Sequence, residues 1–148
     1  MEKAIFVELD GIVRFNVLGV DSMIKSIGEI GIYTDHINKL RSLKALGFKI
    51  LGFSNQPVLG EDLCSDIMAA TNEKTDFLFD EIVWCNHGAE EQCFCKKPDP
   101  SLLESLISKY DVDIKSSVLV GKEELDLVYA LNAGIGHFFY SDSFFNRG

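Results

Sequence analysis

The chain has 148 residues, a length typical of one domain with its own hydrophobic core. Hydrophobic residues make up 47% of it and charged residues 25%, as in ordinary globular proteins. The formal net charge of -9 argues against nucleic acid or an anionic membrane as the partner, because both require a basic surface. No apolar run approaches the ~20 residues that span a bilayer, and the N-terminus shows no signal-peptide pattern. We therefore expect a cytoplasmic protein.

Five short apolar runs predict β-strands, and they are continuous rather than alternating, as in strands covered on both faces. Helical patterns separate most of them, which predicts a parallel α/β sheet with right-handed crossovers in a single domain over residues 1–148. The predicted strands are Ala4–Leu9, Lys49–Phe53, Glu81–Trp84, Ser117–Val120 and His137–Tyr140.

The segments between these strands carry helix signals. In "TDHINKLRSLKALG", Thr34 is placed to cap a helix and Gly47 to end it. "DPSLLESLISKY" and "EELDLVYALNAG" repeat the helical pattern before the last two strands. Residues 11–33 alternate apolar residues with glycines and predict a small hairpin over the site.

Several candidate site residues lie at the ends of the predicted strands. Glu8 and Asp10 lie at the end of the first, Ser54 at the end of the second and Gly121 at the end of the fourth. Because ligands of such sheets bind at the carboxyl ends of the strands, these positions predict a binding site there.

The segment "CNHGAEEQCFC" predicts a metal site. It contains Cys85, His87, Cys93 and Cys95 in the spacing C-x-H-x5-C-x-C, whereas Cys64 lies apart in a helical stretch. In a reducing compartment, close-set cysteines are more often metal ligands than disulfides. Three thiolates and one imidazole fill the tetrahedron of a structural zinc and leave no open position for water. The alternative is that the four residues lie together by chance in a surface loop.

These pieces, in this order, resemble the haloacid dehalogenase-like phosphatases, and within them the branch of histidinol-phosphate and heptose-bisphosphate phosphatases. Family members begin with D-x-D-G-T, which "ELDGI" resembles, and a second strand ends in S/T-N-Q, as residues 54–56 do. The zinc loop over residues 85–95 and the following lysines resemble the branch motif C-x-C-R-K-P. "GKEELD" resembles a fourth motif, G-D-x3-D. The resemblance implies a Rossmann-like parallel sheet flanked by helices, without a large cap domain.

The resemblance also implies roles for individual residues. Glu8 stands at the nucleophile that attacks phosphorus, and Asp10 at the general acid/base. Ser54 and Asn55 stand at the phosphate cradle, and Lys97 at the lysine that neutralises the phosphate. A magnesium ion would bridge the phosphate, the nucleophile and an aspartate of the fourth motif.

Several positions depart from the family pattern. Glu8 is one methylene longer than aspartate, and a misplacement near 1 Å costs ~10²-fold in rate. Lys122 stands where an aspartate binds magnesium, and an ammonium cannot ligate the ion, which makes the magnesium cofactor doubtful. Lys96 replaces an arginine that would contact substrate, and Ile12 replaces a threonine.

Two explanations of the first two departures remain open. Lys122 and Glu8 form an ion pair where a metal complex once lay, or both positions drifted after catalysis was lost. Glu123 would restore metal binding if the loop slipped by one residue. Asp126 matches the last acid of the fourth motif, and the alternative is that it acts only as a partner of the helix dipole.

Two functions follow from these interpretations. The first is a weak or inactive family member that keeps a phosphate pocket and a structural zinc, and that binds a small phosphorylated metabolite or a protein partner. The second is an active phosphatase for a small phosphomonoester, such as a sugar phosphate or a histidinol-phosphate-like compound.

Overall fold

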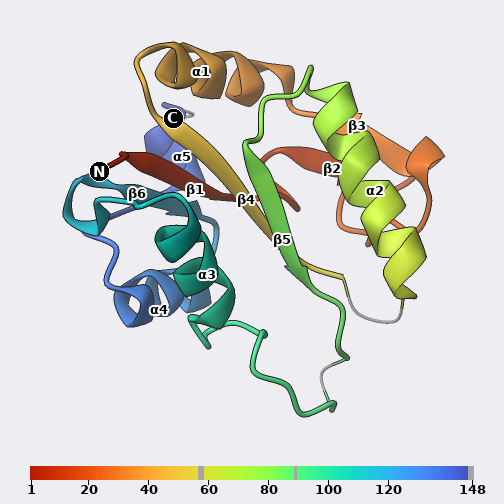
Figure 1. Cartoon of the computed structure of the whole chain (residues 1–148). Coiled ribbons are helices and arrows are strands. Elements are labelled where there is room, and N and C mark those ends of the chain that lie inside the picture. Colours follow the sequence, from red (N-terminus) through yellow and green to blue (C-terminus); the bar gives the residue numbers. More distant parts are fainter. Residues whose placement is uncertain (57–58, 89, 147–148) are drawn as a thin grey trace.

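A parallel five-stranded sheet forms the centre of the protein (Figure 1). The computed structural model describes residues 1–56, 59–88 and 90–146. The strand order is β5-β4-β1-β6-β7, and all neighbours in this sheet pair in parallel. Its strands are β1 (Ala4–Glu8), β4 (Lys49–Asn55), β5 (Glu81–Cys85), β6 (Val118–Gly121) and β7 (His137–Tyr140). The predicted parallel α/β sheet is therefore confirmed.

Helices cover both faces of the sheet. On one face, Ala4 and Phe6 of β1 pack with α3 (Ser101–Lys109) and α4 (Glu124–Ala133). On the other face, Ile5 and Val7 pack with α1 (Thr34–Ala45), α2 (Glu61–Lys74) and the end of α5 (Ser141–Phe144). Two 3-10 helices, η1 (Ile27–Glu29) and η2 (Ile114–Ser116), lie in the connections. Because successive residues of β1 point to opposite cores, all five of its residues are buried.

The element ends differ little from the sequence predictions. The strand β4 extends beyond Phe53 to Asn55 and pairs there with β5, so Ser54 lies within the strand rather than after it. The expectation that Thr34 caps α1 is wrong by one residue. Tyr33 is the N-cap, no side chain caps the helix, and Thr34 is its first helical residue.

Residues 11–33 form the predicted hairpin. The strands β2 (Arg14–Asn16) and β3 (Ile30–Ile32) pair antiparallel as a sheet of their own. The Asn16 amide donates hydrogen bonds to the Met23 carbonyl (3.1 Å) and to the Glu29 carboxylate (3.0 Å), which closes the loop between the strands. None of the helices in the described ranges is long and apolar enough to cross a membrane.

We expect Leu119→Ala to lower the free energy of unfolding by about 2–5 kcal/mol, because Leu119 is fully buried in β6 and truncation leaves a cavity. The matched control is Leu131→Ala in α4, where the side chain is 65% exposed, and we expect a change within about 0.5 kcal/mol. Urea unfolding followed by circular dichroism measures both. Equal losses in the two variants would contradict the assignment of the core.

Candidate active site

The carboxyl edge of the sheet carries the predicted site residues. The strands β1, β4 and β6 run in parallel, so their ends bring Glu8, Ser54 and Gly121 to one edge, and Asp10 follows directly after β1. A pocket of about 700 Å³ opens there between this edge and the loop of the β2–β3 hairpin. Its lining includes acidic residues and lysines together with hairpin residues from Phe15 to Ile24. The hairpin therefore forms the outer wall of the pocket.

Lys97 lies between two buried carboxylates. Its ammonium is 3.1 Å from Glu8 Oε2 and 2.6 Å from Asp126 Oδ1, and 3.6 Å from the more exposed Glu123 Oε1. Glu8 is 4% exposed and Asp126 is fully buried. Asp126 also accepts a hydrogen bond from the Glu123 backbone N–H and forms a capping box at the start of α4. The sequence interpretation of Asp126 as a helix-dipole partner missed its ion pair with Lys97.

Burial sets the protonation of this cluster. Desolvation raises the pKa of Glu8 from 4.5 to about 7, although the Lys97 ammonium lowers it in part. Burial alone would lower the pKa of Lys97, but Glu8 and Asp126 raise it above its ordinary value. Lys97 therefore stays charged near neutral pH, where Glu8 is divided between its acid and its carboxylate forms.

Asp10 is held by a buried guanidinium. Arg14 Nε donates to Asp10 Oδ1 at 2.9 Å, and Arg14 Nη2 lies 3.4 Å from Asp10 Oδ2. The Ser54 hydroxyl donates to Asp10 Oδ2 at 2.6 Å. Both oxygens of the carboxylate are thus occupied by partners within the protein, and the hydroxyl expected at the phosphate cradle is directed at Asp10.

Arg14 is a residue of this candidate site that the sequence analysis did not name. It is fully buried, and its guanidinium also donates to the Thr71 hydroxyl (2.7 Å) and to Gln56 Oε1 (3.3 Å). The one feature of the sequence that could have indicated its role is its position four residues after Asp10. An arginine in a three-residue strand instead predicts a surface position.

The Lys122 ammonium lies beside the turn that follows β1. It donates to the backbone carbonyl of Asp10 at 2.6 Å and packs on Gly11, whose φ is +87°. The expected pair between Glu8 and Lys122 is wrong, because in the described part of the chain Glu8 pairs with Lys97. Lys97 enters from the loop after β5 and fills the space beside the Glu8 carboxylate, so the longer acid reaches a different lysine.

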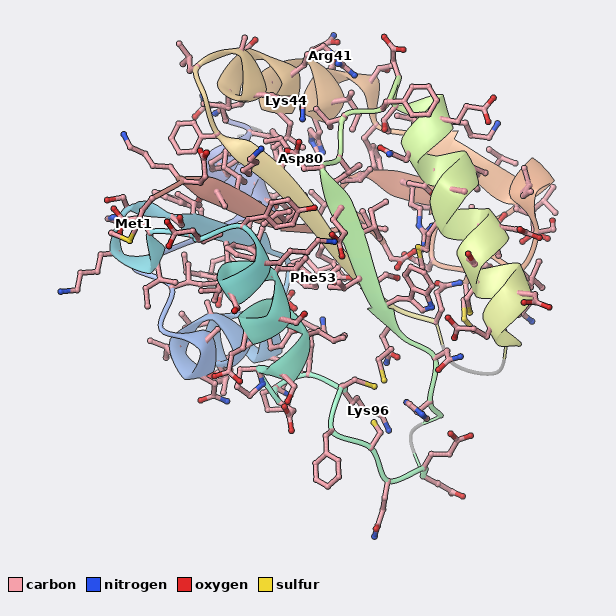
Figure 2. All side chains as sticks on the ribbon, in the orientation of Figure 1. Met1, Arg41, Lys44, Phe53, Asp80 and Lys96 are labelled. Carbon is pink, nitrogen blue, oxygen red and sulfur yellow. The ribbon has the colours of Figure 1, made fainter. Side chains whose placement is uncertain are left out.

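The Cys/His residues after β5 gather in one cluster. Cys85 Sγ is 3.3 Å from His87 Nδ1, 3.7 Å from Cys93 Sγ and 2.8 Å from Cys95 Sγ. All four potential ligand atoms lie within 4.8 Å of one another. Figure 2 shows Lys96 on this loop, beside the sulfur atoms. Its ammonium donates to the Gly88 and Glu91 carbonyls, so Lys96 ties the loop together in addition to lining the pocket.

Asn55 stands at the pocket with an unused acceptor. Its Oδ1 is the one buried side-chain polar atom without a hydrogen-bond partner among the residues the structure describes. Asn55 lines the pocket at the end of β4. Because buried polar atoms are rarely left unpaired, this atom indicates a position that a ligand or water fills.

Comparisons with known proteins find relatives in sequence and in fold. No family model matches the chain. The D-glycero-beta-D-manno-heptose-1,7-bisphosphate 7-phosphatase of Helicobacter pylori is 28% identical over 142 residues, which cover 90% of this chain and 80% of that protein. The histidine biosynthesis bifunctional protein of Legionella pneumophila is 29% identical over 91% of this chain, a match that spans 40% of that longer protein.

A solved D,D-heptose 1,7-bisphosphate phosphatase from B. bronchiseptica, in complex with magnesium and phosphate, shares the fold with a TM-score of 0.79. It is 24% identical, and the match covers 91% of this chain and 78% of that one. The chain has the fold of the haloacid dehalogenase-like phosphatases, as the sequence motifs predict. In sequence it is similar to heptose-bisphosphate phosphatases and to histidine biosynthesis bifunctional proteins, in agreement with the resemblance that the motifs indicate.

The haloacid dehalogenase-like family implies a magnesium ion at this edge, and the donor set tests that expectation. Magnesium requires oxygen ligands in a near-octahedral arrangement. Here Glu8 and Asp126 already bind the Lys97 ammonium, and the Lys122 ammonium lies on the Asp10 carbonyl oxygen. Two ammonium groups thus contact the oxygens that a metal would need. In this arrangement the residues do not fit a magnesium ion.

We expect Glu8→Gln to remove a pH dependence of stability. The pKa of Glu8 is about 7 in the folded chain and 4.5 as its ordinary value, so the folded state binds the proton more tightly. The free energy of unfolding of the wild type, relative to Glu8→Gln, then falls as pH rises from about 4.5 to 7. The shift corresponds to about 3 kcal/mol.

Urea unfolding at pH 5 and pH 8 measures this effect, and Glu2→Gln, at an exposed position, is the control that should keep the wild-type pH dependence. Identical pH dependence in wild type and Glu8→Gln would show that Glu8 is not held in a desolvated position.

Proposed function

We propose that the chain binds a small phosphorylated sugar in the pocket at the carboxyl edge and hydrolyses it weakly. The observation that carries this proposal is that both acids of the first motif are engaged within the protein. Glu8 binds Lys97, and Asp10 binds Arg14 and Ser54. A nucleophile must be free and ionised, and an acid/base must reach the leaving group. Both roles require these contacts to break first.

Four features support a phosphorylated sugar as the ligand. The pocket of about 700 Å³ has room for one, and Lys97 and Lys122 line it as cations. The unused Oδ1 of Asn55 accepts a hydrogen bond from a hydroxyl group of such a compound. The Helicobacter relative is named for a heptose bisphosphate. These features favour a small metabolite over a protein partner, and the expected cytoplasmic location stays a prediction.

The second candidate is an active phosphatase for a heptose bisphosphate or a related phosphomonoester. The relatives named for this activity match 90% of the chain, and Asp10, Ser54 and Lys97 are all present at the edge where the reaction would occur. In this candidate, substrate binding displaces Lys97 from Glu8 and frees the carboxylate. Measured turnover separates the two candidates.

We also propose that Cys85, His87, Cys93 and Cys95 hold a structural zinc. Zinc–sulfur distances of about 2.3 Å and zinc–nitrogen distances of about 2.0 Å place tetrahedral ligand atoms roughly 3.5 Å apart. The separations of 3.3 and 3.7 Å from Cys85 to His87 and Cys93 agree with that arrangement, whereas the 2.8 Å between the sulfur atoms of Cys85 and Cys95 would have to lengthen around the ion. The ion would fix a polar loop that has few apolar residues with which to pack.

We expect the wild type to hydrolyse heptose 1,7-bisphosphate with magnesium at less than ~1 s⁻¹, the low end of the usual enzyme range. The double variant Glu8→Asp with Lys122→Asp restores the family's acids, and we expect a rate at least tenfold above that of the wild type. Phosphate release measures both. Lys115→Asp, at an exposed position in η2 that is not part of the pocket lining, is the charge-matched control. Wild-type turnover of ~1 s⁻¹ or more would establish the second candidate.

We expect one zinc per chain after purification with the metal, as measured by elemental analysis. Cys93→Ser should lose stoichiometric zinc and lower the Tm by roughly 5 °C or more, because the metal stabilises the folded state that holds it. Cys64→Ser is the matched control, since Cys64 is buried in α2 outside the cluster and its loss leaves the zinc content at one. Wild-type protein without stoichiometric zinc would refute the site.

A further inference from the structure

Lys122 is held with its ammonium at the pocket. Its backbone N–H donates to Asp126 Oδ2 at 2.9 Å, and its ammonium donates to the Asp10 carbonyl at 2.6 Å. Between these two contacts the side chain lies against Gly11, where an added Cβ would be 3.1 Å from Nζ. A side chain at Gly11 would therefore crowd the ammonium, and the turn conformation at φ +87° favours glycine.

Lys122 differs from the other lysines that line the pocket. Lys97 is occupied by carboxylates, and Lys96 by carbonyl oxygens of the Cys/His loop. Within the described residues, Lys122 makes no ion pair and uses one of its three N–H donors on the Asp10 carbonyl. It thus brings an uncompensated positive charge to a pocket of a protein with a net charge of -9.

We infer that the Lys122 ammonium takes the place of a divalent cation, so that the pocket binds a phosphate group without any metal ion. The remaining donors of the ammonium face a phosphate that lies beside the Asp10–Gly11 turn, and an ammonium binds phosphate oxygens by charge-assisted hydrogen bonds. This inference rests on the proposed function, because it concerns the phosphate group of the same ligand.

The test is isothermal titration calorimetry with inorganic phosphate as the probe, in EDTA and in magnesium. We expect the wild-type Kd to agree within twofold between the two conditions. Lys122→Met keeps the length of the side chain without its charge, and we expect its Kd in EDTA to rise at least tenfold. Lys115→Met is the matched control, and its Kd should equal that of the wild type.

Lys122→Asp adds a second readout. It should bind phosphate at least tenfold more weakly than the wild type in EDTA and recover affinity when magnesium is added. Circular dichroism and thermal melting test whether each variant is folded. We expect the variants at position 122 to fold, because Lys122 is exposed.

The outcomes separate the two proposals. Wild-type phosphate binding that is at least tenfold tighter with magnesium, or Lys122→Met that binds as tightly as the wild type in EDTA, would overturn the inference and leave the proposed function standing. Wild-type protein that binds no phosphate in either condition would overturn both.

Discussion

Three carboxylates meet at the carboxyl edge of the sheet, and the arrangement of this end of the molecule depends on how their charges are balanced. Glu8 and Asp126 are buried, and Asp10 stands between the core and the pocket. Removing one partner from a buried ion pair costs about 3–5 kcal/mol, because it leaves an uncompensated charge. The chain meets this constraint with Lys97 for Glu8 and Asp126, and Arg14 for Asp10.

The same balance explains why the glutamate is tolerated at the end of β1. A buried carboxylate at this position needs a cationic partner near the edge of the sheet. The side chain of Glu8, one methylene longer than aspartate, brings its carboxylate to 3.1 Å from the Lys97 ammonium. Lys97 cannot neutralise both buried acids fully, and desolvation raises the pKa of Glu8 to about 7. The ion pair with Lys97 and the partial protonation of Glu8 together offset the unfavourable desolvation of the Glu8 carboxylate.

The sequence predicted the framework better than the contacts within the site. The five strands were recognisable because each is a short apolar run between helical patterns, and strand ends in a parallel sheet share an edge whatever their side chains are. The partner of Glu8 was not predictable from spacing. Lys97 and Lys122 both have long side chains that follow different loops to the same edge, and their directions depend on the folded backbone.

The burial of Arg14 was likewise not predictable from the sequence. A charged residue in a three-residue strand predicts a surface position, because most arginines are exposed. In the folded chain, α2 supplies Thr71 and the end of β4 leads to Gln56, and these acceptors come from segments more than 40 residues away. Burial of the guanidinium depends on acceptors that are assembled only by the tertiary fold.

The Cys/His cluster and the candidate pocket share one stretch of backbone, which links the proposed zinc site to the proposed ligand site. Cys85 ends β5 and pairs with Asn55 in the neighbouring strand, and its carbonyl accepts the Gln56 N–H at 2.7 Å. At the other end of the loop, Cys95 is separated from Lys97 by Lys96 alone. A metal that draws Cys95 toward Cys85 therefore fixes Lys97 relative to the ends of β4 and β5. In the proposed zinc site, the ion would supply the order that apolar packing supplies elsewhere. The metal would then anchor the backbone two residues before Lys97, which meets both carboxylates.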